Sequence, residues 1–230
     1  AQMVQCHENM RLLGTAAPRE RFRLGGIPYP PACDAFVALC GEHETLPELE
    51  LSYYCDDPEA AWDKLLLSEL DMMLSLCSPE AGERLLRQCK QQGLSIRHLV
   101  EVPIVLRIGP NHPLYHAPEI HLSDFEGYTL VDYNRRAFLD VPNLSTLMKI
   151  DPDRVITVSD RSMKYTLISQ GTMYALDCKL PPITNQRFKF RCIPLGDLHY
   201  SLYVIQRRDT ADTPLGRRYL ELLSSILKDL

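Results

Sequence analysis

Hydrophobic and polar residues follow one another along the first half of the chain in an order that predicts alternating strands and helices. Three segments have the length and pattern of strands: 22–27 and 70–76 are mostly apolar, and 49–54 alternates between apolar and polar residues. The stretch after the first run has apolar positions on one helical stripe, at Cys33, Phe36, Val37 and Cys40. Pro58 after Asp57 predicts a helix start, and residues 78–92 predict another helix, with Leu85, Leu86 and Cys89 on one side. Such alternation predicts a parallel sheet with right-handed crossovers.

A second set of elements follows the first. Strands are predicted at 102–108, 128–132, 155–158, 172–177, 188–192 and 199–206, the last after a turn at Gly196-Asp197. One helix is expected between 134 and 148, and another begins at Ser159 or Asp160 and ends at Gly171. A last amphipathic helix opens at Thr213-Pro214, with a stripe at Leu215, Tyr219, Leu222 and Ile226.

The final strand and helix would complete the first sheet, so the chain is expected to cross between two lobes twice. We predict an α/β fold with two Rossmann-like lobes joined by two crossover strands. Lobe I would comprise residues 18–100 and 200–230, and lobe II residues 101–199. Residues 1–17 carry a helix–helix seam pattern on too short a segment to be stable alone. They are either the tail of a longer linker helix or a frayed terminus.

Composition and charge reduce the number of function classes that fit this chain. The chain has 230 residues, 45% of them hydrophobic and 24% charged, as in an ordinary globular protein. A formal net charge of −5 without a run of Lys and Arg argues against this chain gripping a phosphate backbone by itself. Eight cysteines without CxxC spacing fit a reducing cytoplasm. No signal-peptide core and no apolar stretch of about 20 residues appears, so we expect a cytoplasmic protein that does not enter a membrane.

Catalytic and metal chemistry finds little support in the sequence. His112, His116 and His121 are close together, but Pro113 and Pro118 break any helix that would align them on a metal. No nucleophile elbow, P-loop or dinucleotide fingerprint is present. The Cys55 thiol precedes Asp56 and Asp57, whose carboxylates would raise its pKa rather than activate it. We therefore expect no enzyme, no metal and no cofactor.

Four stretches resemble the effector-binding domain of LysR-type transcriptional regulators, in the order expected of that family. They are LLLSELDMMLSL at 65–76, VLRIGPNHPL at 105–114, SDRSMKYTLISQGTMYAL at 159–176 and GRRYLELLSSIL at 216–227. The resemblance implies the fold of type 2 periplasmic binding proteins, with a small-molecule effector between the lobes. It also implies a homodimer or homotetramer formed through lobe I, by the helix starting near Pro31 and the strand near Tyr53. DNA would be bound only through an N-terminal winged helix-turn-helix that this chain lacks, and residues 1–17 match the tail of its linker helix in position.

In the first lobe, the resemblance places the effector against the turn that contains Pro28 and Tyr29. Pro28, Pro30 and Pro31 lack N–H donors, which makes capture of an anion at this turn doubtful. Tyr29 could stack on a flat effector and hydrogen-bond to it. The alternative is that the turn merely fixes the chain direction and that Tyr29 packs on the surface.

In the second lobe, the candidate ligand-binding residues follow strands or begin helices. They are Asp132, Tyr133, Asn134 and Arg135 after one strand, Ser159, Asp160 and Ser162 at a helix start, and Asp177 and Cys178 after another strand. Val102 would lie on the hinge floor. Arginine offers a bidentate grip on an acid, although Arg135 or Arg136 is expected to be solvated. Capping is the plainest role of the Ser159–Ser162 stretch, with ligand contact as the second.

The leading hypothesis is thus an effector-sensing regulatory domain that controls a DNA-bound oligomer. The alternative is a stand-alone solute-binding or transport protein of the same fold. The sequence upstream in the gene would separate them, since a winged helix favours the regulator and a signal peptide the receptor. An enzyme on this fold would need turnover that is lost on mutation of Asp160 or Cys178.

Overall fold

The protein is described from a computed structural model. The structure describes residues 20–46, 48–55, 58–133, 154–208, 213–228 and 230. Several predicted features lie outside these residues: the linker tail at 1–17, the Asp57 cap, the helix between 134 and 148, and the candidates Asn134 and Arg135. Within the described residues, no helix is both long and apolar enough to cross a membrane.

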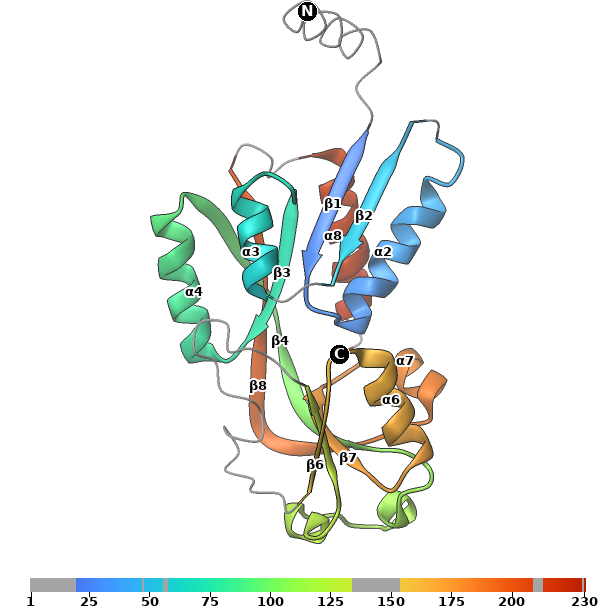
Figure 1. The fold of residues 1–230 in the computed structure, drawn as a ribbon. Coiled ribbons are helices and arrows are strands. Elements are labelled where there is room, and N and C mark those ends of the chain that lie inside the picture. The colour runs from blue at the N-terminus through green and yellow to red at the C-terminus, as the bar shows by residue number, and fades with distance from the viewer. Residues whose placement is uncertain (1–19, 47, 56–57, 134–153, 209–212, 229) are drawn as a thin grey trace, which may run out of the picture.

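Lobe I is centred on three parallel strands, as the sequence predicts (Figure 1). They are β1 (Arg21–Gly26), β2 (Glu50–Tyr54) and β3 (Met72–Cys77), in the order β2-β1-β3. Helices α2 (Pro30–Glu42) and α8 (Pro214–Leu227) share one core cluster with β1, while α3 (Pro58–Leu66) and α4 (Pro79–Gln91) share another with β3. Helices therefore cover both faces of this sheet, which buries β3 and most of β1, while the edge strand β2 stays half-buried.

Two long strands connect the lobes and confirm the predicted fold class. β4 (Leu94–Ile108) and β8 (Arg191–Arg207) pair antiparallel with each other, and the full strand order is β2-β1-β3-β8-β4-β7-β5-β6. β8 adds to β3 in lobe I, and β4 adds to β7 in lobe II. Figure 1 shows both strands running from one lobe into the other.

The sequence underestimates the length of both crossover strands. The predicted pieces were 102–108 and 199–206, with a turn at Gly196-Asp197. That turn is wrong: Gly196 lies inside β8 with φ +62°, where the strand bends. The missed parts, 94–101 in β4 and 193–198 in β8, consist mostly of exposed and half-buried positions, so they lack the regular apolar alternation by which strands are recognised.

Lobe II contains β5 (Leu130–Tyr133), β6 (Val155–Val158) and β7 (Tyr174–Cys178), with helices α6 (Arg161–Gln170) and α7 (Pro182–Phe188). Two short 3-10 helices, Pro113–His116 and Leu122–Phe125, lie at its far end. The prediction that Phe188 starts a strand is wrong, because α7 ends there. The chain reverses at Lys189, whose φ of 54° is left-handed, and β8 then begins.

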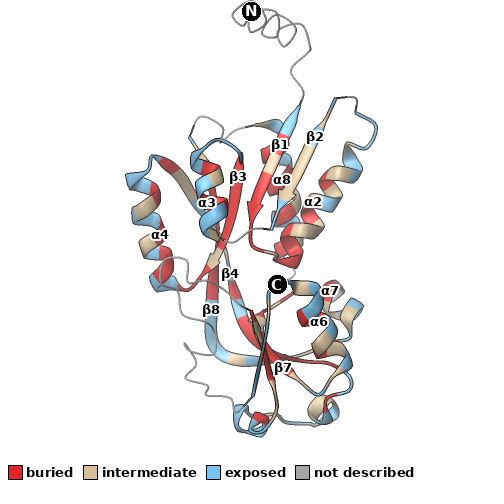
Figure 2. Ribbon diagram, viewed as in Figure 1, coloured by how far each residue is buried: buried red, intermediate tan, exposed pale blue. Residues whose placement is uncertain are grey.

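The core follows the strands and the inward faces of the helices (Figure 2). The helical stripe predicted for α2 is wrong in part: Val37 is 69% exposed, and the buried face carries Ala32, Ala35 and Leu39. Small alanines let α2 approach α8 closely, so its buried face is less hydrophobic than the stripe we expected. Leu86 on α4 is likewise 44% exposed, whereas Leu85 and Cys89 are buried.

Candidate functional site

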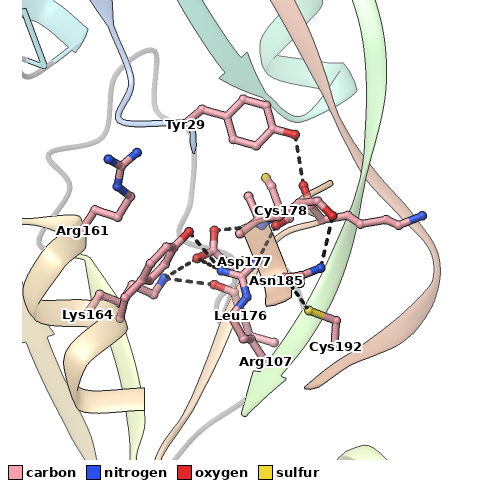
Figure 3. A network of polar contacts seen from close by, with 12 residues as sticks. Tyr29, Arg107, Arg161, Lys164, Leu176, Asp177, Cys178, Asn185 and Cys192 are labelled. Atoms are coloured by element: carbon pink, nitrogen blue, oxygen red, sulfur yellow. Dashed lines mark hydrogen bonds and ion pairs between the residues drawn. The ribbon is translucent and has the colours of Figure 1, made fainter. Parts of the chain in front are cut away.

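Tyr29 lies between the lobes, at the N-terminus of α2. β1 ends at Gly26, whose φ of +126° turns the chain, and Tyr29 then serves as the N-cap before two prolines. Its side chain is 4% exposed, and its hydroxyl donates a hydrogen bond to the backbone carbonyl of Lys179 at 3.0 Å (Figure 3). Burial raises the pKa of Tyr29, so the hydroxyl remains a donor. The alternative of a tyrosine on the surface is therefore wrong.

The backbone amides of this turn are already used within the turn itself. Tyr29 N–H donates to the carbonyl of Ile27 at 2.8 Å. The N–H groups of Ala32 and Cys33 donate to the carbonyl of Tyr29 at 3.0 and 3.2 Å. A helix N-terminus binds anions through unsatisfied N–H groups, so this one offers little to an anion. Recognition on this side falls to the Tyr29 side chain.

A buried group of charged side chains lies beneath Tyr29, in lobe II. Arg107 of β4 is completely buried, and its Nη1 donates to Asp177 Oδ2 at 2.7 Å. Lys164 of α6 is 1% exposed, and its Nζ lies 3.5 Å from the same Asp177 oxygen. Burial, the largest single influence, lowers the pKa of Arg107, but the Asp177 carboxylate together with Tyr165 and Cys192 raises it by more, so the guanidinium stays charged.

Further contacts fix the position of Arg107. Its second terminal nitrogen donates to the carbonyl of Cys178 at 2.8 Å, and its first lies 3.3 Å from the Tyr165 hydroxyl. The guanidinium carbon lies 5.3 Å from the ring centres of both Tyr165 and Phe190, within the range of cation–π attraction. Arg107 Nε has no hydrogen-bond partner among the described residues. The charged group is thus held rigidly by a shell of aromatic rings.

The cavity between these groups is small. Its volume is about 20 Å³, which suits a single water molecule. Nine residues line it: Ile27, Pro28, Tyr29, Pro30, Leu76, Tyr133, Tyr165, Asp177 and Cys178. A ligand of more than a few atoms therefore requires Tyr29 or the lobes to move.

Polar contacts hold the two lobes together at the cavity mouth. Arg161, the first residue of α6, donates to the Pro28 carbonyl and to the Cys33 sulfur, both at 3.2 Å. The Thr184 hydroxyl of α7 lies 3.5 Å from the Asp34 carboxylate of α2. With the hydrogen bond between Tyr29 and Lys179, these contacts join the N-terminus of α2 to three segments of lobe II.

The structure brings five of the predicted site residues to this cavity: Pro28, Tyr29, Tyr133, Asp177 and Cys178. Val102 is instead completely buried in the main core cluster. The Asp132 carboxylate faces its own backbone, where it accepts a hydrogen bond from the N–H of the next residue, Tyr133, at 2.8 Å.

The residues at the start of α6 lie outside the cavity lining. Asp160 is the N-cap, and its carboxylate accepts a hydrogen bond from the Met163 N–H at 2.9 Å. This is the role that the sequence makes plainest for this stretch. Ser159 and Ser162 are exposed. Among the described residues, no group of three His, Cys, Asp or Glu side chains is placed to hold a metal ion.

Arg107, Arg161, Lys164 and Tyr165 belong to the site but were not selected from the sequence. Arg107 had a signal, since it is the one charge inside the apolar run IVLRI at 104–108. A charged residue in a buried strand is rare unless it is paired, so it marks a site. Arg161 and Lys164 gave a weaker signal, because lysine and arginine on a helix are usually solvated.

A family model described as the LysR substrate binding domain matches residues 16–227. The chain belongs to this family. It is a family of transcriptional regulators and not of enzymes. Comparison with the sequences of characterised proteins gives no match.

Solved structures of other LysR regulators share the fold at low sequence identity. The regulatory domain of MetR from N. meningitidis is 18% identical with a TM-score of 0.63, and the alignment covers 93% of this chain and 97% of that one. The BenM effector-binding domain, solved with its effector benzoate, is 17% identical with a TM-score of 0.60, covering 92% and 94%. The QuiR effector-binding domain, solved with shikimate, is 14% identical with a TM-score of 0.57, covering 92% and 97%.

Proposed function

We propose that this LysR substrate-binding domain senses a small metabolite between its lobes and thereby controls a DNA-bound oligomer. The observation that carries the proposal is the pair of buried cations Arg107 and Lys164, held by the partly buried Asp177 directly beneath Tyr29. Burying charges is costly, and a hydrophobic replacement is often as stable. Groups retained at that cost beside an interlobe cavity are candidates for ligand recognition.

The contacts at the cavity mouth suggest how binding is transmitted. Opening the lobes would break the Tyr29 hydrogen bond to Lys179 and the Arg161 contacts to Pro28 and Cys33. An effector shifts the balance between open and closed forms by its difference in affinity for them. Replacement of these direct contacts by ligand-mediated ones would change the angle between the lobes. That change would alter how the subunits of the oligomer are arranged.

Tyr29 and the lobe II side chains would set the specificity for the effector. BenM has benzoate as its effector, and QuiR was solved with shikimate. The ring of Tyr29 suits a flat molecule such as benzoate, while its hydroxyl and the Arg107 group suit polar substituents. We include Pro28, Tyr133, Asp177 and Cys178 in the proposed ligand-binding set. Asn134 and Arg135 remain in it from the sequence.

We extend the proposal to assembly and location. Lobe I would comprise residues 18–100 and 200–230, and lobe II residues 101–199. A homodimer or homotetramer would form through lobe I, where Val37 on α2 is 69% exposed and β2 is an edge strand. DNA would be contacted by a separate N-terminal domain, since this chain has a net charge of −5. The free cysteines suit the cytoplasm.

A thermal-shift screen of organic acids, amino acids and aromatic metabolites tests the function. A ligand at 100 times its Kd adds about 2.7 kcal/mol, which raises the midpoint of a domain this size by roughly 5–11 °C. We expect the shift to persist in Tyr54→Phe, a control at an exposed tyrosine of β2, and to vanish in Tyr29→Ala. Circular dichroism would verify that both variants fold. A ligand shift that survives in folded Tyr29→Ala would contradict the proposed site.

A further inference from the structure

Cys33 lies in the first turns of α2, at the contact between the lobes. Its sulfur accepts a hydrogen bond from Arg161 Nη1 at 3.2 Å and lies 3.7 Å from the Tyr53 hydroxyl. The side chain is half-buried. The positive guanidinium beside the sulfur favours the thiolate over the thiol.

Cys55 is the neighbour of Cys33 because of the strand register. β1 and β2 run parallel with Gly25 opposite Tyr54, so Cys55 follows β2 at the edge where β1 leads into α2. The two thiols are close enough to form a hydrogen bond. Cys55 is exposed, and every cysteine in the described part of the chain is a free thiol. The pair is therefore within reach of solutes.

The two sulfurs have opposite acid–base character. The hydrogen bond from Cys55 and the charge of Arg161 lower the pKa of Cys33 to about 6, although burial acts against them. The same hydrogen bond raises the pKa of Cys55, which keeps its proton. Cys40, two turns further along α2, has a pKa raised by burial. At neutral pH the pair thus holds one thiolate and one thiol, the arrangement of an attacking and a resolving sulfur.

We propose that Cys33 and Cys55 are a redox-active pair that hydroperoxides convert to a disulfide. The Cys33 thiolate attacks the outer oxygen of ROOH, the O–O bond breaks, and the alkoxide takes a proton and leaves as ROH. The Cys33 sulfenic acid is then attacked by the Cys55 sulfur. The S–O bond breaks, and the hydroxide leaves as water with the Cys55 proton. Two thiols are oxidised by two electrons, and one peroxide is reduced.

Oxidation has a structural consequence at the mouth of the cavity. A disulfide replaces the negative sulfur beside Arg161 with a neutral one, so the guanidinium loses an ionic partner between the lobes. Its hydrogen bond to the Pro28 carbonyl does not depend on that charge. The pair would therefore couple the oxidation state to the same interlobe contact that closes over the cavity.

The purified wild-type chain tests the proposal without any variant. Limited iodoacetamide labelling at pH 6, followed by peptide mass spectrometry, compares Cys33 with Cys40 on the same helix. Half of Cys33 would be thiolate at that pH, against about one part in a thousand for a thiol of pKa 9. A thiolate of low pKa is intrinsically less nucleophilic, so the expected advantage of Cys33 in labelling rate is about 20-fold. The pH profile of Cys33 labelling should move to higher pH in Arg161→Gln.

Peroxide treatment tests the second step. Hydrogen peroxide should give a dithiothreitol-reversible loss of two hydrogens and a cross-linked peptide joining Cys33 to Cys55. Cys40→Ser should behave like wild type, while Cys55→Ser should accumulate a Cys33 sulfenic acid that dimedone traps. Equal labelling of Cys33 and Cys40 would overturn the proposal. So would consumption of Cys33 by peroxide without the cross-link.

Discussion

Replacing Asp177 with asparagine tests how strongly the buried charges of the site are coupled. Asp177 Oδ2 accepts a hydrogen bond from Arg107 Nη1 at 2.7 Å, and Arg107 is completely buried. Asparagine keeps the size of the side chain and removes its charge. The Arg107 guanidinium then loses the charged partner that compensates for its burial. Breaking a buried ion pair in this way typically costs about 3–5 kcal/mol.

That cost is large for a protein of this size. Total stabilities are about 5–15 kcal/mol, so Asp177→Asn should remove a substantial fraction. The melting midpoint should fall by roughly 6–20 °C, since each kcal/mol shifts it by about 2–4 °C in a domain of this length. Urea unfolding followed by circular dichroism would give the free energy of unfolding, with the slope m unchanged if the unfolded state is the same.

A surface pair of similar geometry provides the matched control. Arg218 donates to both Glu42 oxygens at 2.8 and 2.6 Å, but both side chains are open to solvent. Water and salt screen such a pair, so Glu42→Gln should change the free energy of unfolding far less than Asp177→Asn. Equal costs for the two variants would refute the argument that burial makes the Arg107–Asp177 pair strong.

Three further outcomes follow from particular contacts. Burial lowers the pKa of His112 below its usual 6.5, so the free energy of unfolding should decline as the pH falls below 6.5. His112→Asn keeps an acceptor for the Leu114 N–H and should flatten that decline in urea titrations from pH 7 to 5. Val37→Glu should weaken the proposed dimer in light-scattering measurements, whereas Leu67→Glu, at an equally exposed leucine, should not. Gly26→Ala should lower the melting midpoint or abolish folding, since a Cβ would lie 2.2 Å from the Leu74 carbonyl oxygen at φ +126°.

The order of elements in lobe I is predictable from the sequence because its strands are buried and short. Mostly apolar stretches such as 70–76 occur where both faces of a strand are covered. The crossover strands are harder because parts of them are exposed and show no hydrophobic pattern. The segment from 194 to 199 in β8, where five of six residues are exposed, shows this most clearly. The sequence does not reveal α7 because its seven residues begin with the second of two consecutive prolines and look like a loop.

Site residues can be predicted from the sequence only where they lie at or directly after the end of a strand. Tyr29, Asp177 and Cys178 end or follow strands at the edge facing the other lobe, which general rules for open sheets indicate. Arg107 lies inside β4, and it is joined to the cavity because its long side chain donates to Asp177 and Cys178, which line the cavity. Its pairing joins residues 70 positions apart. Such a contact depends on the strand order β8-β4-β7, which local patterns do not specify.

The two kinds of contact at the cavity differ in how easily a ligand can replace them. The hydrogen bond from Tyr29 to the Lys179 carbonyl has a typical net worth of about 0.5–1.5 kcal/mol, and an effector that offers its own acceptor and donor can take over both ends. Replacing the Arg107–Asp177 pair costs more, because the Arg107 charge is completely buried and would be left without its carboxylate partner. A cavity with room for about one water must enlarge to hold an effector. The Tyr29 side of the cavity should move more easily than the side held by the Arg107–Asp177 pair. Recognition would therefore combine a movable aromatic ring with a fixed charged floor, and variants of the two should differ accordingly: those of Tyr29 in ligand affinity, those of Asp177 in folding.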